Sequence, residues 1–264
     1  MADAMSNLQR RQRPAPARRH PYARGMGELI PLFPLGTPLF PGVVLPLQIF
    51  EPRYRRLLRD LTVLPEASEQ RSFGVVAIRQ GWEVEHVAPA AALYDVGCTA
   101  RLHTVHAQPD GGFRIVTVGG DRFRLLDVVV GDDPPYLQGK VEWLADEEAA
   151  GDATAGDVSG LGRGVRDLFL EYVAEVASLG VGRDDVEVAT MLKAVADDAG
   201  ALSWLVASSA LLTADDRQEL LAESAIRRRL RAEARMLRRE LTILQSIGAV
   251  PVPLQQFATP MTVN

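Results

Sequence analysis

The sequence contains very little cysteine and very little lysine. Its 264 residues include one cysteine, Cys98, and two lysines, Lys140 and Lys193, among 29 basic residues. A single cysteine excludes a disulfide within the chain and is typical of a reducing compartment. A Walker-type phosphate loop needs Gly-Lys-Ser/Thr, and neither lysine is followed by serine or threonine. The sequence therefore predicts neither a disulfide-stabilised fold nor an ATPase.

Long apolar runs are also missing. No run approaches the roughly 18–20 apolar residues that cross a bilayer, and no apolar segment typical of a secretory signal follows the arginine-rich N-terminus. Residues 1–28 lack hydrophobic periodicity, which predicts a disordered basic tail. The net charge of −5 argues against a general nucleic-acid binder. We expect a cytoplasmic protein without a membrane contact.

Motifs for catalysis and metal binding are absent as well. There is no G-x-S-x-G nucleophile elbow. His103 and His106 fall in a predicted strand, where side chains three positions apart point to opposite faces, and no further ligand completes a zinc site. Cys98 of the same strand is expected to be buried. The sequence predicts no catalytic residue, no metal and no cofactor, while an activity around Cys98, His103 and His106 stays open as an alternative.

Residues 29–145 show a β-rich pattern. An apolar stretch with five prolines opens this region, LFPLGTPLFPGVVLPLQIFEPRYRRLL over 32–58. Short strands with close turn signals then favour a compact barrel-like sheet over a βαβ fold. Two hairpins are predicted, turning at PDGG (109–112) and at GGD (119–121). One helix is expected from Pro52, with Tyr54 and three leucines on its apolar face.

The remainder of the chain shows helical periodicity after a change in composition. Residues 146–160 are acidic and rich in small residues, which predicts a linker. A helical bundle is expected over 161–248, ending in one long helix over 214–247 that Thr213 caps. Residues 249–264 are expected to form a C-terminal tail. The predicted fold class is therefore α+β, with strands before helices.

The opening stretch resembles the start of the N-terminal substrate-binding domain of Lon proteases, especially the stand-alone bacterial relatives. Four further segments agree in order, FGVVAI, VGCTARL, FRIVTVGGDRFRLLDV and PYLQGKVEWL. The resemblance extends over about residues 29–248. It implies a PUA-like β pseudo-barrel that carries a helical bundle, and it implies substrate recognition in a chain without the ATPase and protease modules of full Lon enzymes.

The resemblance also implies a place where polypeptides bind. Aromatic side chains of the proline-rich stretch can present apolar area beside an unpaired strand, which could accept an extended peptide. Packing of these aromatic residues in the barrel core is the alternative for each of them. The candidate peptide-binding residues are Phe33, Phe40, Phe50, Glu51, Arg53 and Tyr54.

The expected function is non-catalytic binding of unfolded or exposed polypeptide segments in protein quality control, with a Lon-type protease as a partner. The alternative is an RNA- or nucleotide-binding PUA-like protein, because arginines cluster over 53–59 and 227–239. The interspersed glutamates and the lack of aromatic residues in the second cluster favour a solvated helix face there.

Overall fold

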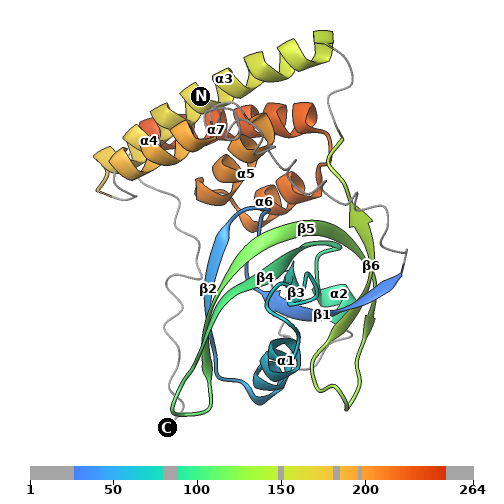
Figure 1. Ribbon diagram of the computed structural model, residues 1–264. Helices are drawn as coiled ribbons and strands as arrows, with labels where there is room; N and C mark the ends of the chain where they lie inside the picture. The colour runs from blue at the N-terminus through green and yellow to red at the C-terminus, as the bar shows by residue number, and fades with distance from the viewer. Residues whose placement is uncertain (1–26, 80–88, 148–151, 181–184, 196–197, 248–264) are drawn as a thin grey trace, which may run out of the picture.

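The computed structural model describes residues 27–79, 89–147, 152–180, 185–195 and 198–247. Figure 1 shows a barrel-like β part, with a helical part packed across one end of it. The strands are β1 (Glu28–Leu35), β2 (Val44–Ile49), β3 (Ser72–Ala77), β4 (Val96–Ala107), β5 (Phe113–Val129) and β6 (Gln138–Leu144). The predicted α+β class, with strands before a helical C-terminal part, is confirmed.

The two predicted tails fall almost entirely outside the described residues. Only Gly27 and Glu28 of the segment 1–28 are described, and β1 begins at Glu28. The segment 249–264 lies outside the described residues completely.

The six strands form one sheet in the order β2-β5-β4-β3-β1-β6, and an additional β5–β6 pairing closes it. The pairing of β1 with β3 is parallel, whereas the other pairings are antiparallel. The 17-residue strand β5 pairs with β2 through its first half and with β6 through its second half. Figure 1 shows β5 arching between these two neighbours. The barrel is therefore closed by β6 beside one half of β5, whereas β2 lies beside the other half.

The hairpin predicted at residues 119–121 is wrong, because β5 runs through this segment without turning. Both glycines have ordinary backbone angles, but neither has room for a side chain. A Cβ on Gly119 would lie 2.0 Å from the Phe40 carbonyl oxygen, and a Cβ on Gly120 would lie 2.6 Å from the Thr99 hydroxyl oxygen. Here glycine permits the close approach of another part of the chain rather than a turn. The other predicted turn is present, and Gly111 adopts a positive φ of 77° in it.

The predicted amphipathic helix is confirmed as α1 (Pro52–Thr62). Pro52 begins the helix, where the missing N–H is not needed. The four apolar residues at helical spacing all point into the core, and they are Tyr54, Leu57, Leu58 and Leu61. Figure 1 places α1 at the end of the barrel opposite the helical part. The short helix α2 (Pro89–Ala92) precedes β4.

The helical part differs from the sequence prediction in two ways. Its helices are α3 (Asp152–Ser178), α4 (Asp185–Ala194), α5 (Ala199–Ser209), α6 (Ala214–Ala222) and α7 (Ile226–Ile247). The predicted linker over 146–160 is helical from Asp152 onward, since the small residues there do not prevent α3 from extending back. The predicted helix over 214–247 is two helices, although Thr213 does cap the first, accepting from the Asp216 N–H.

Two buried arginines explain the break between α6 and α7. Arg122 of β5 donates to the Leu221 carbonyl oxygen at 2.8 Å, and Arg229 of α7 donates to the Glu223 carbonyl oxygen at 2.8 Å. Both guanidinium groups also reach the Asp146 carboxylate, at 2.7 and 3.2 Å. The guanidinium of Arg229 lies 3.5 Å from the centre of the Trp204 ring. Where the helical hydrogen-bond pattern ends, backbone carbonyl groups thus accept hydrogen bonds from the two buried arginines.

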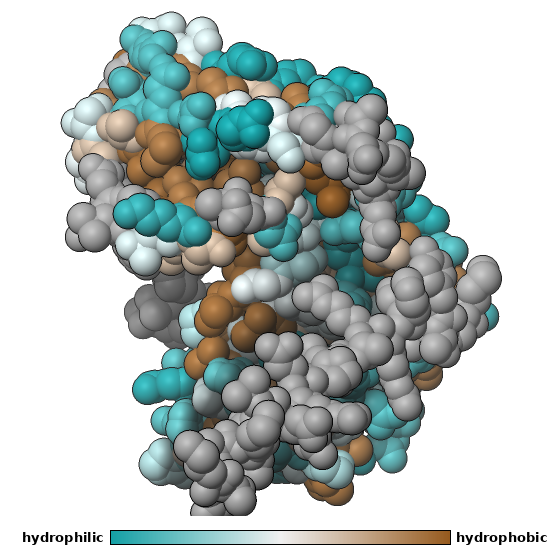
Figure 2. Space-filling view, turned by 45° about the horizontal axis from the view of Figure 1, so that its top comes forward, coloured by the Kyte–Doolittle hydropathy of each residue, from teal (hydrophilic) through white to brown (hydrophobic). Residues whose placement is uncertain are grey.

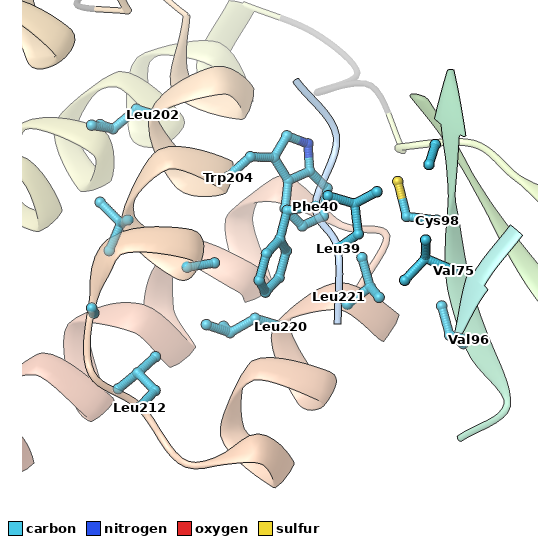
Figure 3. Packing of buried hydrophobic residues seen from close by; sticks show 14 of the residues in the cluster. Leu39, Phe40, Val75, Val96, Cys98, Leu202, Trp204, Leu212, Leu220 and Leu221 are labelled. Carbon is cyan, nitrogen blue, oxygen red and sulfur yellow. The ribbon is translucent and has the colours of Figure 1, made fainter. Parts of the chain in front are cut away.

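The β part and the helical part share one apolar core. Figure 3 shows Leu39 and Phe40, from the loop between β1 and β2, lying between the helices and the strands. The Phe40 ring lies 6.0 Å from the Trp204 ring of α5, measured between centroids. Leu220 and Leu221 of α6 complete the contact. Burial of this apolar area stabilises the packing of the two parts.

Candidate functional site

An opening in the barrel wall separates β1 from β2, and we call it the seam. It is bounded by residues 32–35 of β1 and by residues 44–49 of β2. The strand β6 pairs with β1 only over residues 28–31, while β2 pairs only with β5 among the described strands. Each of the two strands therefore has an edge on the seam without a neighbouring strand in the described part of the chain.

A proline occupies the seam edge of β1. The Leu32 N–H donates to the Leu137 carbonyl oxygen on the β6 side, at 2.8 Å. The Leu35 carbonyl oxygen accepts from the Ile78 N–H on the opposite, β3 side, also at 2.8 Å. Because backbone groups alternate in direction along a strand, Pro34 turns its backbone toward the seam. Proline has no N–H, so β1 offers the seam a carbonyl acceptor at this position and no donor.

A second proline occupies the seam edge of β2. The Val43 carbonyl oxygen accepts from the Gly119 N–H at 2.9 Å, so Val43 faces β5. By the same alternation Val44, Pro46 and Gln48 turn their backbone groups away from β5, toward the seam. Both edges thus carry a proline where an N–H would otherwise point into the opening. The prolines of the opening stretch therefore prevent β1 and β2 from closing the barrel between them.

The seam contains an apolar pocket of about 340 Å³, which we call the seam pocket. The Phe33 and Tyr54 rings stack within its wall, with centroids 4.1 Å apart. The Phe50 side chain stands at the rim with 63% of its surface exposed. The pocket is lined by Phe33, Pro34, Leu35, Leu47, Gln48, Ile49, Phe50, Glu51, Arg53, Tyr54 and Ile78.

The structure brings together five of the six predicted site residues in this lining: Phe33, Phe50, Glu51, Arg53 and Tyr54. Phe40 is not among them. It is only 1% exposed and packs against the helical part, so the alternative of core packing applies to it. Phe33 and Tyr54 line the pocket but also belong to the apolar core, with 8% and 5% of their surfaces exposed. The loop between β1 and β2 carries Phe40 away from the seam and under Trp204.

The family model of the ATP-dependent protease La (LON) substrate-binding domain matches residues 29–239 of the chain. The chain belongs to this family.

The chain is also similar to curated Lon proteases and to solved Lon N-terminal domains. Lon protease 1 of Herpetosiphon aurantiacus is 28% identical over 217 residues, which cover 82% of this chain and 24% of that protein. The N-terminal domain of a Lon protease from the Mycobacterium avium complex has a TM-score of 0.58 at 18% identity, covering 80% of this chain and 98% of that one. The Lon N-terminal domain protein of Xanthomonas campestris has a TM-score of 0.51 at 24% identity, covering 85% of this chain and 99% of that one.

At these identities the two solved structures establish the fold alone. The chain spans about a quarter of the length of the curated relatives it matches, which are full Lon proteases.

The polar groups of this Lon substrate-binding domain stand at the rim of the seam pocket. The carboxylate of Glu51 and the guanidinium of Arg53 form an ion pair at 2.8 Å. The guanidinium of Arg53 also lies over the Tyr54 ring, 4.8 Å from its centre. Burial raises the pKa of the Tyr54 hydroxyl to about 12, so the ring stays neutral. An apolar pocket whose rim includes strand edges that pair with no other described strand is suited to holding apolar side chains of an extended chain.

Sequence reasoning missed six of the lining residues, which are Pro34, Leu35, Leu47, Gln48, Ile49 and Ile78. The first five belong to the proline-rich stretch, where an apolar residue would fit either the core or the pocket. Ile78 follows β3, and only the parallel β1–β3 pairing brings it to the seam. No local pattern in the sequence marks such a residue.

The alternative activity around Cys98 finds no support in the geometry. The Cys98 side chain is fully buried, and burial raises the pKa of its thiol, which disfavours the reactive thiolate. Its sulfur lies 3.5 Å from the carbonyl oxygens of Thr99 and Gly120. His103 and His106 are exposed on β4. Among the described residues no group of three or more His, Cys, Asp or Glu could hold a metal ion.

The arginines of α7, which suggested nucleic-acid binding, are largely neutralised within the domain. Arg227 pairs with Asp157 at 2.6 Å, Arg235 with Glu219 at 3.0 Å, and Arg239 with Asp216 at 2.6 Å. An arginine engaged with a carboxylate attracts phosphate less strongly than a free one. The face of α7 is therefore a salt-bridged surface, as expected for a solvated helix.

A second apolar hollow of about 210 Å³ lies in the helical part, between α3, α4 and α5. Its lining includes Phe169, Tyr172, Met191 and Leu205. Figure 2 shows apolar side chains, in brown, reaching the surface of this part among hydrophilic ones. No helix in the described part of the chain is long and apolar enough to cross a membrane.

Proposed function

We propose that this Lon substrate-binding domain binds extended, unfolded polypeptide segments at the seam and does not itself catalyse a reaction. The observation that carries the proposal is an apolar pocket between two strand edges that face no other described strand. An extended segment can add to such an edge, because its main chain supplies the missing partners.

The backbone groups along the two seam edges can form hydrogen bonds with an incoming strand more readily than with each other. Along the seam, Val44 and Gln48 offer an N–H and a carbonyl each, while Pro34 and Pro46 offer carbonyls alone. A bound segment brings its own N–H groups to these acceptors. Its alternate side chains would point into the seam pocket, where Phe33, Tyr54 and Phe50 supply aromatic area.

The proposal includes a cellular setting. A substrate-binding domain that resembles only the recognition part of Lon proteases supports a role in protein quality control, with a Lon-type protease as a partner in the cytoplasm. Among the described residues, the lining of the seam pocket contains no serine, threonine, cysteine, histidine or lysine, which supports binding without catalysis.

Binding of fluorescein-labelled β-casein, a permanently unfolded protein, tests the proposal by fluorescence anisotropy. We expect saturable binding at micromolar concentration and a loss of about tenfold in affinity for Phe50→Ala. The matched control is Val130→Ala, because Val130 has the same exposed fraction of 63% and lies outside the lining of the seam pocket. Tyr54 is a poorer choice, since it is 5% exposed and its loss would disturb α1.

Two results would contradict the proposal. One is the absence of saturable binding by the folded domain. The other is an equal loss of affinity in the Phe50→Ala and Val130→Ala variants, which would show that the seam pocket is not where the segment binds.

A further inference from the structure

A basic face adjoins the seam on the outside of the barrel. The outward side chains follow from the strand register, in which Gln48 lies opposite Arg114, and Arg114 lies opposite His106. The next residue of β5, Ile115, points inward and is fully buried, so Arg114 points outward. Arg101 lies opposite Val118, which shares this face with Arg114. We call the exposed residues Arg101, His106 and Arg114 the basic face.

The basic face contains no acidic residue. The strand segments that form it, 44–49, 101–107 and 113–118, include no aspartate or glutamate. The nearest acid along the hairpin is Asp110 at its tip, whose carboxylate accepts from the Gly112 N–H at 2.9 Å. This contrasts with α7, where the arginines pair with carboxylates of neighbouring elements. The charge of the basic face is therefore not balanced by acidic neighbours on the same strands.

The basic face begins at the rim of the seam pocket. Gln48 lines the pocket and also stands opposite Arg114 on the next strand. Neighbouring strands lie about 4.8 Å apart, so a segment added to the seam edge of β2 would lie about 10 Å from the Arg114 backbone. The long Arg114 side chain and an aspartate or glutamate side chain of the segment can together span this distance across Gln48. A side chain of the bound segment that points outward beside Gln48 would thus meet Arg114.

We propose that the seam prefers extended polypeptide segments whose apolar centre is flanked by aspartate or glutamate. The inference rests on the proposed function and specifies its substrate class. The apolar centre would occupy the seam pocket, while the acidic flanks would lie against the basic face. Opposite charges attract and like charges repel across the sheet surface, so lysine-flanked segments would be disfavoured at the same place.

A polypeptide fits this face better than single-stranded nucleic acid does. Single strands are bound by cationic grooves that also carry aromatic residues for base stacking. The residues between the cations are Thr104, Val116 and Val118, none of them aromatic. The seam edge of β2, which pairs with no other described strand, favours a partner with a peptide backbone.

Three matched peptides test the inference by fluorescence anisotropy with the full chain. All contain a central Leu-Val-Phe-Val-Leu sequence, and their flanks are acidic (Asp and Glu), neutral (Gln) or basic (Lys). We expect the acidic peptide to bind about tenfold more tightly than the basic one, with the neutral peptide between them. Arg114→Gln should lower the affinity for the acidic peptide about fivefold and change the affinity for the neutral peptide less than about twofold.

The matched control is Arg124→Gln on the same strand, since Arg124 is already paired with Glu142 at 3.1 Å and lies outside the basic face. It should leave all three affinities unchanged. Equal binding of the three peptides would overturn the inference while the proposed function stands. Failure of the neutral peptide to bind at all would instead overturn the proposed function. An oligouridine that displaces the acidic peptide and loses affinity in Arg114→Gln would reassign the face to nucleic acid.

Discussion

The seam and the contact between the β part and the helical part use the same short segment of sequence in opposite ways. Phe50 at the seam is 63% exposed, whereas Phe40 at the contact is 1% exposed. At the contact, the carbonyl groups freed between α6 and α7 accept from Arg122 and Arg229. At the seam, the backbone groups of β2 face no described strand. The contact engages these carbonyl groups within the domain and is structural, while the seam edge of β2 faces no other strand among the described residues and can take a partner.

Removing the Phe40 ring should have the largest effect on stability. Phe40→Ala leaves a cavity between the loop, α5 and α6, and we expect the free energy of unfolding to fall by roughly 3–5 kcal/mol. Urea denaturation followed by Trp fluorescence measures this loss. Phe50→Ala should change the unfolding free energy by less than about 1 kcal/mol, because the ring is mostly in water already. Similar losses in the two variants would erase the distinction between contact and seam.

Breaking the buried polar cluster should cost somewhat less. Arg229→Met removes the guanidinium group that donates to the Glu223 carbonyl oxygen, and it leaves the buried Glu233 without its neighbouring cation. We therefore expect the free energy of unfolding to fall by about 3 kcal/mol. The control is Arg235→Met on the exposed side of the same helix, where loss of the pair with Glu219 should cost less than about 1 kcal/mol. An Arg229→Met protein as stable as its control would mean that the cluster does not stabilise the contact.

Per pH unit, the smallest expected change is a pH dependence of stability that originates at the contact. Burial raises the pKa of Glu233 from 4.5 to about 8 in the folded chain, although Ser203 and Arg229 oppose the shift. Between these two values the folded state holds a proton that the unfolded state has released, so the stability should fall as pH rises. The slope can reach about 1.4 kcal/mol per pH unit.

Denaturation midpoints at pH 5 through 9 for wild type and Glu233→Gln measure this dependence. The stability of Glu233→Gln should depend less on pH between the two pKa values, since glutamine does not titrate. Peptide binding at the seam, by contrast, should not depend on the protonation of Glu233, because Glu233 lies in the helical part. A wild-type stability that rises over the same window would contradict the assigned direction.

The sequence pattern predicted the elements with local signals. Proline at the first helical position and leucines at helical spacing identified α1, and an Asp-Gly turn identified the β4–β5 hairpin. The sequence pattern gave a wrong prediction where the same local signal can arise from two different physical causes, a turn or a close contact. Gly119 and Gly120 predict a turn by composition, yet they sit in β5 because Phe40 and Thr99 approach too closely for a side chain.

The candidate site was predicted in part, for a similar reason. Five of the six residues singled out from the sequence line the seam pocket, and five further lining residues come from the same proline-rich stretch. Their part in binding stays a prediction. Phe33 and Phe40 are indistinguishable by local pattern, but the chain places one in the seam wall and the other under Trp204.

The sequence by itself determined that strands precede helices, the apolar face of α1, and the missing N–H groups of Pro34 and Pro46. These are properties of single residues and their near neighbours along the chain. Only the tertiary structure decided that the two prolines face one opening, that Arg101 and Arg114 share a face, and that Phe40 is buried. Such facts depend on which distant strands pair, because pairing fixes the direction in which each side chain and each backbone group points.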